Sequence, residues 1–140
     1  MSTDPSDLDP ETLVHLGCIQ TLNRGDVEKT RQFYTDDATY STAGIDDETV
    51  EDLIDQAEMW QQAVPDLEAD IVETVVDEAD GITFEYVVRG TQQGPLAGIP
   101  PTGGSFETKG VGFAELDNGL ISEYTLVFDR FGMFKQLGVV

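Results

Sequence analysis

The sequence has 140 residues, the length of one ordinary domain, and 39% of them are hydrophobic, which is too many for a disordered chain. The formal net charge is −21, because 28 Asp and Glu residues outnumber seven Lys and Arg residues. Such sparse and scattered basic residues argue against nucleic acid and anionic membranes as partners. We therefore expect a single domain over residues 1–140, in which residues 1–8 are flexible.

The acidic surplus also bears on the environment of the protein. Most of the 28 acidic residues lie before residue 81, so the first part of the chain is the more polar part. A dense carboxylate surface with few lysines suits a protein that stays soluble where salt screens its self-repulsion. We expect a halophilic source.

The cellular location is inferred from two features of the sequence. Cys18 is the single cysteine, so no disulfide can form within the chain, and we expect it to be a small buried helix residue. The start MSTDPSDLDP has neither a basic nor an apolar stretch, and no run of about 18 apolar residues occurs. We expect a cytoplasmic protein.

Three helices are predicted in the first half of the chain. Asp9 and Pro10 are typical of a helix N terminus. The third helix has apolar residues at helical spacing and acidic residues on its other face, and Pro65 ends it. The predicted helices span residues 10–23, 26–34 and 47–64.

The second half alternates apolar and polar side chains, which predicts long antiparallel strands. Turn sequences at Asp80-Gly81 and Asp117-Asn118-Gly119 join them into hairpins. Helices followed by such strands indicate an α+β fold, with the helices packed on one face of a curled sheet. The predicted strands span residues 38–41, 67–77, 82–91, 105–116 and 120–128, and a final short helix spans residues 131–137.

Several short motifs occur together in this chain. They are Asn23-Arg24-Gly25-Asp26, Thr35-Asp36-Asp37-Ala38, Gly90-Thr91, Gly98-Ile99-Pro100-Pro101-Thr102-Gly103, the turn from Asp117 to Ile121 followed by Glu123, and Asp129 ahead of Gln136-Leu137-Gly138. In this combination the chain resembles the SnoaL-like polyketide cyclase (ester cyclase) family, within the nuclear transport factor 2-like superfamily. The resemblance covers nearly the whole chain.

The resemblance implies a cone: a strongly curved, mostly antiparallel sheet wrapped against three N-terminal helices, with a pocket inside and a short C-terminal helix. Characterised members close a ring in a polyketide ester by intramolecular aldol condensation, without a metal or an organic cofactor. Members are commonly homodimers that associate through the outer face of the sheet. The chain is therefore expected to bind a hydrophobic small molecule, to need no cofactor and to form a homodimer.

Two positions depart from the family pattern. Relatives commonly have histidine where this chain has Gln92, so a titratable group is lost. Relatives often have tryptophan where this chain has Thr125, two residues after Glu123, which is expected to widen the pocket wall or make it more polar. Both departures put the family's own substrate in question for this chain.

Asp129 is the candidate catalytic residue. Aldol closure needs a base, and a carboxylate beside an apolar wall can remove a proton from carbon flanked by carbonyls. Asp129 follows the apolar run Leu126-Val127-Phe128, and the family places its acid/base aspartate here. The alternative is that Asp129 caps the final helix, and the two roles can coexist.

Further residues are candidates for the pocket wall. Tyr40 and Trp60 belong to the first strand and third helix, which line the cavity in cone folds. Glu123 shares strand parity with Asp129, so without a bulge the two face the same side. Arg89 is a candidate for binding an anionic or enolate oxygen, or else forms a surface ion pair. The weaker wall candidates are Tyr86, Gln92 and Phe113.

Two classes of function follow. The leading one is a cofactor-free enzyme of the cyclase or isomerase type, in which Asp129 removes a proton; a hydrolytic variant would use Asp129 and Glu123 to activate water. The alternative is a non-enzymatic module of the same fold that binds a hydrophobic ligand or dimerises, and the loss of histidine at Gln92 favours it. The sole histidine, His15, is expected to be structural.

The charge pattern makes a direct prediction about salt. Because salt screens the mutual repulsion of the carboxylates, raising KCl from 0.1 M to the molar range should raise the melting temperature strongly. Thermal unfolding followed by circular dichroism across KCl concentrations measures this effect. A melting temperature that does not rise with KCl would contradict the halophilic interpretation.

Overall fold

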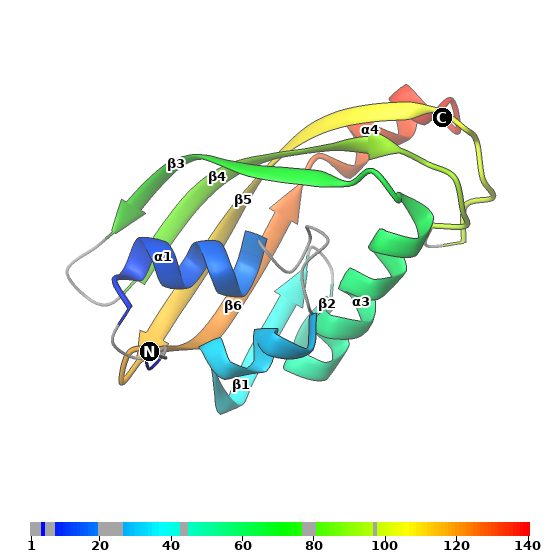
Figure 1. The fold of residues 1–140 in the computed structure, drawn as a ribbon. Helices are drawn as coiled ribbons and strands as arrows, with labels where there is room; N and C mark the ends of the chain where they lie inside the picture. The colour runs from blue at the N-terminus through cyan, green and yellow to red at the C-terminus, as the bar shows by residue number, and fades with distance from the viewer. Residues whose placement is uncertain (1–3, 5–7, 20–26, 43–44, 77–80, 97) are drawn as a thin grey trace.

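The computed structural model describes residues 4, 8–19, 27–42, 45–76, 81–96 and 98–140. Six strands form one sheet in the order β2-β1-β6-β5-β4-β3 (Figure 1). All neighbouring strands are antiparallel except β1 and β6, which run parallel. The strands are β1 (Tyr34–Thr42), β2 (Ile45–Thr49), β3 (Glu68–Val76), β4 (Gly81–Thr91), β5 (Ser105–Asp117) and β6 (Leu120–Phe128).

The helices lie mainly on one side of this curled sheet (Figure 1). The concave face packs against α1 and α3, whereas α4 lies against β5 near the C terminus. None of the described helices is long and apolar enough to span a bilayer. The helical segments are α1 (Pro10–Val14), the π-helical segment η2 (His15–Ile19), the 3-10 helix η3 (Val27–Phe33), α3 (Val50–Ala63) and α4 (Arg130–Leu137).

The α+β fold class predicted from the sequence is confirmed, and so are the three long strands β4, β5 and β6. The first predicted helix is α-helical only as far as Val14 and continues as a π-helical turn to Ile19. Asp9 caps it as expected, since its side chain accepts from the Thr12 N–H. The predicted corner at residues 23–26 and the turn residue Asp80 lie outside the described residues.

The predicted start of the third helix is wrong. The helix begins at Val50, because Thr49 caps it and Asp52 completes a reciprocal capping box with the Thr49 backbone. Glu48, which falls within the predicted helix 47–64, belongs instead to β2, where it is the direct cross-strand partner of Tyr40. This register brings a carboxylate next to a residue of the first strand.

Two glycines of β5 let the aromatic side chains of β4 lie close to the sheet. Tyr86 pairs with Gly110 and Phe84 pairs with Gly112 in the β4–β5 register. A Cβ atom at Gly112 would come within 2.1 Å of the Phe84 ring, so the ring occupies the space that a side chain would need. This arrangement buries Phe84 and Tyr86, which are each 1% exposed, on the concave face.

Replacing Gly110 by alanine should therefore destabilise the protein. The new Cβ would lie 2.4 Å from the Tyr86 ring and 2.5 Å from the Val127 carbonyl oxygen, and the latter belongs to the backbone. We expect Gly110→Ala to lower the free energy of unfolding by about 1–3 kcal/mol, measured by urea denaturation. The exposed neighbour Lys109→Ala is the control and should change it by less than about 0.5 kcal/mol. Equal stability of the two variants would contradict this packing.

Candidate functional site

A cavity of about 540 Å³ lies between the concave face of the sheet, α3 and the start of α4. This volume is in the range of small-molecule binding sites. Three predicted wall residues, Tyr40, Trp60 and Tyr86, line it. The full lining is Tyr40, Thr42, Leu53, Gln56, Ala57, Met59, Trp60, Leu67, Tyr86, Val88, Leu96, Leu126, Phe128, Arg130, Met133 and Phe134.

Aromatic rings form one end of the cavity. The Trp60 ring meets the Phe128 ring edge to face, with centroids 5.8 Å apart, and the Phe106 ring at 6.2 Å. The Arg130 guanidinium carbon lies 5.6 Å from the centre of the Phe128 ring, a cation–π distance. The lining therefore combines flat apolar surface with a positive charge at the start of α4.

A polar chain of three residues forms another part of the wall. The Tyr40 hydroxyl donates to Oε1 of Gln56 at 3.3 Å, and Nε2 of Gln56 donates to Oε2 of Glu48 at 2.9 Å. Burial raises the pKa of Tyr40 above its ordinary value, and the nearby negative charge of Glu48 raises it further. Tyr40 therefore keeps its proton at neutral pH.

Gln56 and Glu48 were not predicted as site residues. Gln56 lies on the same helical face as Leu53 and Trp60. A polar residue at helical spacing within an apolar stripe was the sequence feature that could have identified it as a wall residue. Glu48 gave no such signal, because the sequence assigned it to the third helix rather than to a strand. Its place opposite Tyr40 depends on the β1–β2 register.

Asp129 lies at the N terminus of α4 and outside the cavity lining. Its Oδ1 accepts the Gly132 N–H at 2.8 Å, which confirms the predicted helix cap. The side chain is exposed, although both of its neighbours in the chain, Phe128 and Arg130, line the cavity. Asp129 thus stands in the chain between two lining residues, a position called the rim below, and its catalytic role stays a prediction. Among the described residues, none that lines the cavity carries a carboxylate.

Gln92 is fully buried and holds the loop that follows β4. Its Nε2 donates to the carbonyl oxygens of Gly94, Ile99 and Pro100 at 3.1–3.3 Å. Its Oε1 accepts from the backbone N–H and the hydroxyl of Thr102. Gln92 is therefore an anchor for this loop and does not line the cavity, in contrast to its predicted position in the wall.

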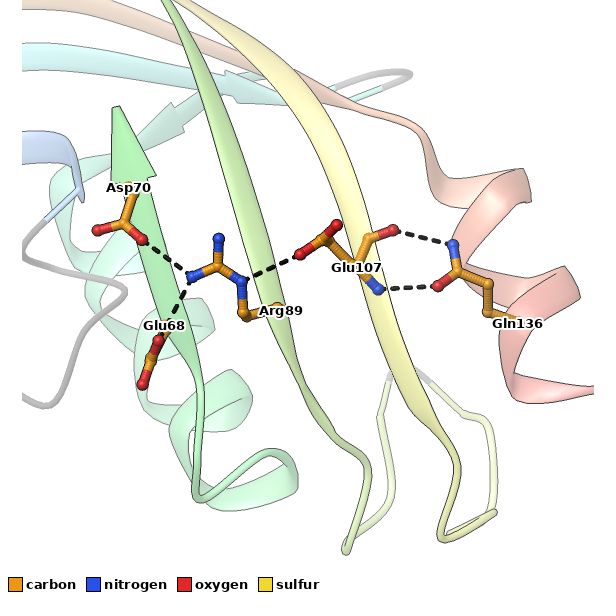
Figure 2. Close-up of polar contacts among 5 residues, drawn as sticks. All are labelled: Glu68, Asp70, Arg89, Glu107 and Gln136. Carbon is orange, nitrogen blue, oxygen red and sulfur yellow. Dashed lines mark hydrogen bonds and ion pairs between the residues drawn. The ribbon is translucent and has the colours of Figure 1, made fainter. Parts of the chain in front are cut away.

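Arg89 lies on the opposite face of the sheet from the cavity and is surrounded by carboxylates (Figure 2). Its guanidinium pairs with Asp70 at 2.9 Å, with Glu107 at 3.1 Å and with Glu68 at 3.4 Å. The hydrogen bonds to Asp70 and Glu107 hold the pKa of Arg89 above its usual value. Arg89 therefore forms the surface ion pair that was the alternative to binding an enolate oxygen.

Two further predicted wall residues, Phe113 and Glu123, also lie on the outer face. The β5–β6 register shifts between Glu115 and Leu116, and beyond this irregularity Tyr124, Leu126 and Phe128 face inward. Glu123 is exposed and Phe113 is 48% exposed. Glu123 was expected to face the cavity, but it directly precedes the inward-facing Tyr124, so its side chain points to the outer face.

Thr125 is directly opposite Phe113 on the outer face, so it does not widen the cavity as predicted. Other apolar side chains are exposed nearby, including Val75 and Val127. Val75 and Phe113 lie opposite Thr83, on either side of it in the sheet. A homodimer formed through this face stays a prediction.

His15 and Cys18, which were both expected to be structural, do not line the cavity. His15 is exposed at the start of η2. Cys18 is buried beside Tyr34, whose hydroxyl donates to the Gly17 carbonyl oxygen at 2.8 Å. Burial raises the pKa of Cys18 to about 12, so the thiol is unreactive at neutral pH, in keeping with its predicted structural role. Among the described residues, no cluster of three or more His, Cys, Asp or Glu side chains could hold a metal ion.

A cone with this internal cavity defines a class of α+β domains that bind small molecules. The family model for SnoaL-like polyketide cyclases matches residues 12–137, so the chain belongs to this family. The predicted family is thereby confirmed, as is the nuclear transport factor 2-like fold. No curated protein matches the chain.

Solved structures with the same fold come from several bacteria. IdmH from Streptomyces antibioticus, described as a candidate polyketide cyclase, is 27% identical with a TM-score of 0.80, over 94% of this chain and 100% of that one. TsrD from Streptomyces laurentii is 22% identical with a TM-score of 0.82, over 96% and 100%. A candidate SnoaL-like polyketide cyclase from Jannaschia sp. CCS1 is 20% identical with a TM-score of 0.81, over 96% and 98%.

The anchoring role of Gln92 can be tested by substitution. Gln92→Leu keeps the approximate volume but leaves three carbonyl groups and the Thr102 donors without their partner. We expect the free energy of unfolding to fall by about 2–4 kcal/mol, measured by urea denaturation. The adjacent Gln93 is exposed, so Gln93→Leu is a matched control with little effect. Similar stability of both variants would show that the loop does not depend on Gln92.

Proposed function

We propose that this protein is a small-molecule enzyme of the cyclase type, which binds an apolar ester of the polyketide class in the cavity and closes a ring in it. The observation that carries this proposal is the aromatic cavity of about 540 Å³ in a member of the SnoaL-like family. A flat, multi-ring substrate suits walls built from Trp60, Phe128 and Tyr86. The substrate would bury most of its apolar surface there.

Polar groups at two places would orient such a substrate. Tyr40 and Gln56 offer hydrogen bonds on one wall, and the Arg130 guanidinium offers a positive charge at the start of α4. A cation in this position favours the carbonyl or ester end of the substrate, where negative charge develops when an enolate forms. The substrate would therefore place its reacting end next to α4 and its apolar rings against Trp60.

We propose Asp129 as the base for this reaction. Gly132 holds Oδ1, so Oδ2 is the oxygen that would take a proton from the carbon between two carbonyl groups. The resulting enolate carbon attacks a second carbonyl carbon, which forms the new C–C bond. The alkoxide made in that step takes the proton back from Asp129, so the base is regenerated. Arg130, the next residue, stabilises the enolate oxygen meanwhile.

The position of Asp129 at the rim sets a condition for this mechanism. The side chain is exposed in the absence of ligand, so water solvates its charge. A substrate that extends from the cavity to the start of α4 would cover the carboxylate and remove that water. Removal of water strengthens an ionised carboxylate as a base. The mechanism therefore requires a substrate long enough to reach from Trp60 to the rim.

A second candidate function is ligand binding without turnover. The observation that favours it is the lack of a carboxylate among the described residues that line the cavity. Gln92, where relatives commonly have histidine, serves the loop and supplies no titratable group. A cavity that binds a hydrophobic metabolite needs only its apolar walls and the polar groups of Tyr40 and Gln56.

The variant Asp129→Asn separates the two functions. Asparagine caps helices as well as aspartate does, so α4 and the fold should remain. The assay uses aromatic methyl esters with an open side chain that contains a 1,3-dicarbonyl unit. Ring closure gives a product of equal mass, which is followed by liquid chromatography coupled to mass spectrometry. We expect the rate to fall by about 100-fold or more, with the melting temperature and substrate affinity unchanged.

The control for this experiment is Asp117→Asn, which makes the same change at an exposed turn between β5 and β6 and should keep full activity. Wild-type turnover in Asp129→Asn would remove Asp129 from the mechanism. Tight binding of the esters by the wild-type protein without ring closure would support the second candidate function instead.

A further inference from the structure

We propose that Glu48, acting through Gln56, fixes the hydrogen-bond direction of the Tyr40 hydroxyl, so that the cavity selects ligands that carry a hydroxyl group at this wall. Tyr40 is then the residue that contacts the ligand, and Gln56 and Glu48 are positioning residues. The inference rests on the proposed binding of a small molecule in the cavity, and it adds a chemical requirement for that molecule.

The three residues come from three elements that the fold brings together. Tyr40 on β1 is directly opposite Glu48 on β2, and Gln56 lies in the second turn of α3 above this pair. Both Tyr40 and Gln56 line the cavity, whereas Glu48 does not. Tyr40 is 2% exposed, so its hydroxyl exchanges hydrogen bonds with neighbours or with a ligand rather than with bulk water.

The charge of Glu48 sets the orientation of the Gln56 amide. An ionised carboxylate only accepts hydrogen bonds, so the amide atom 2.9 Å from Glu48 Oε2 must be the nitrogen of Gln56. The amide oxygen then faces Tyr40, at 3.3 Å from its hydroxyl. The reverse orientation would place the Gln56 oxygen against the carboxylate. Glu48 thus fixes the amide so that its oxygen, and not its nitrogen, faces the Tyr40 hydroxyl.

The orientation of the amide in turn decides what Tyr40 offers to a ligand. A tyrosine hydroxyl has one proton, and here the proton points to the Gln56 oxygen. The remaining lone pairs accept a hydrogen bond from the cavity. If the proton turned to a ligand instead, the Gln56 oxygen would lose its donor in a partly buried position, which is unfavourable. A ligand hydroxyl can donate to Tyr40, whereas a methyl ether at the same place cannot.

Paired aromatic probes test this selectivity. The probes are 2-naphthol, 2-methoxynaphthalene and 2-ethylnaphthalene, and isothermal titration calorimetry measures their dissociation constants for the full chain. We expect 2-naphthol to bind about five- to tenfold more tightly than 2-methoxynaphthalene, the value of one neutral hydrogen bond. The ethyl compound has the shape of the ether without its oxygen, so the two should bind equally.

Three variants assign the effect to the proposed residues. Tyr40→Phe removes the acceptor and should abolish the preference for 2-naphthol. Glu48→Gln lets the Gln56 amide turn, so the preference should fall at least about threefold, and the ether should gain affinity. Glu73→Gln makes the same charge change at an exposed site on β3 and should behave like the wild type. Circular dichroism confirms that each variant is folded.

The outcomes separate this inference from the proposed function. If the wild-type protein binds none of the three probes, binding of aromatic ligands in the cavity fails, and this inference fails with it. If all three bind equally well, or if Tyr40→Phe keeps the preference, the cavity binds ligands but Tyr40 does not select them. If Glu48→Gln keeps the full preference while Tyr40→Phe loses it, the role of Glu48 is overturned.

Discussion

The close contact between the aromatic rings of β4 and the glycines of β5 is the constraint on which the cavity depends. Phe84 and Tyr86 lie across Gly112 and Gly110, where any side chain would collide with the rings. Tyr86 also lines the cavity, and Phe128 is the β6 partner of Gly110. Tyr86, Gly110 and Phe128 are therefore direct neighbours across three adjacent strands, with one wall residue on each side of the glycine. Without this close packing the concave face could not keep an open space next to a buried aromatic core.

Polar side chains hold the elements that surround this apolar space. Gln92 holds the loop after β4 through its hydrogen bonds. Gln136 of α4 binds the backbone of Glu107 on β5 (Figure 2): its Nε2 donates to the Glu107 carbonyl oxygen, and its Oε1 accepts from the Glu107 N–H. Asp129 caps the first turn of α4. Because α4 supplies Arg130, Met133 and Phe134 to the lining, these contacts at its two ends set the shape of the cavity near its rim. None of the three anchoring side chains lines the cavity itself.

The sequence predicted the fold class and the long strands, because alternation, turn sequences and helix caps are local signals. It also predicted Tyr40, Trp60 and Tyr86 as wall residues correctly. It failed where a side chain's position depends on strand register. Glu123 shares strand parity with Asp129 as expected, but this side of β6 is the outer face of the sheet. The short strand β2, whose sequence resembles a helix start, puts Glu48 opposite Tyr40. The β5–β6 and β1–β2 pairings join strands that follow one another in the chain, but the alternation of apolar and polar residues reveals neither a short polar strand nor a register shift.

Among the described residues, negative charge is kept out of the cavity lining, although the lining includes the positive charge of Arg130. The chain has 28 acidic residues, and two of them adjoin lining residues without lining the cavity: Glu48 accepts from the Gln56 amide, and Asp129 accepts from the Gly132 N–H. This arrangement avoids the cost of placing an unpaired carboxylate against apolar walls. In the proposed mechanism the proton is therefore taken by Asp129, next to Arg130, and not by a residue of the described cavity lining. Under this proposal the interior would serve for binding and selection, and a ligand would react only if it were long enough to reach Asp129.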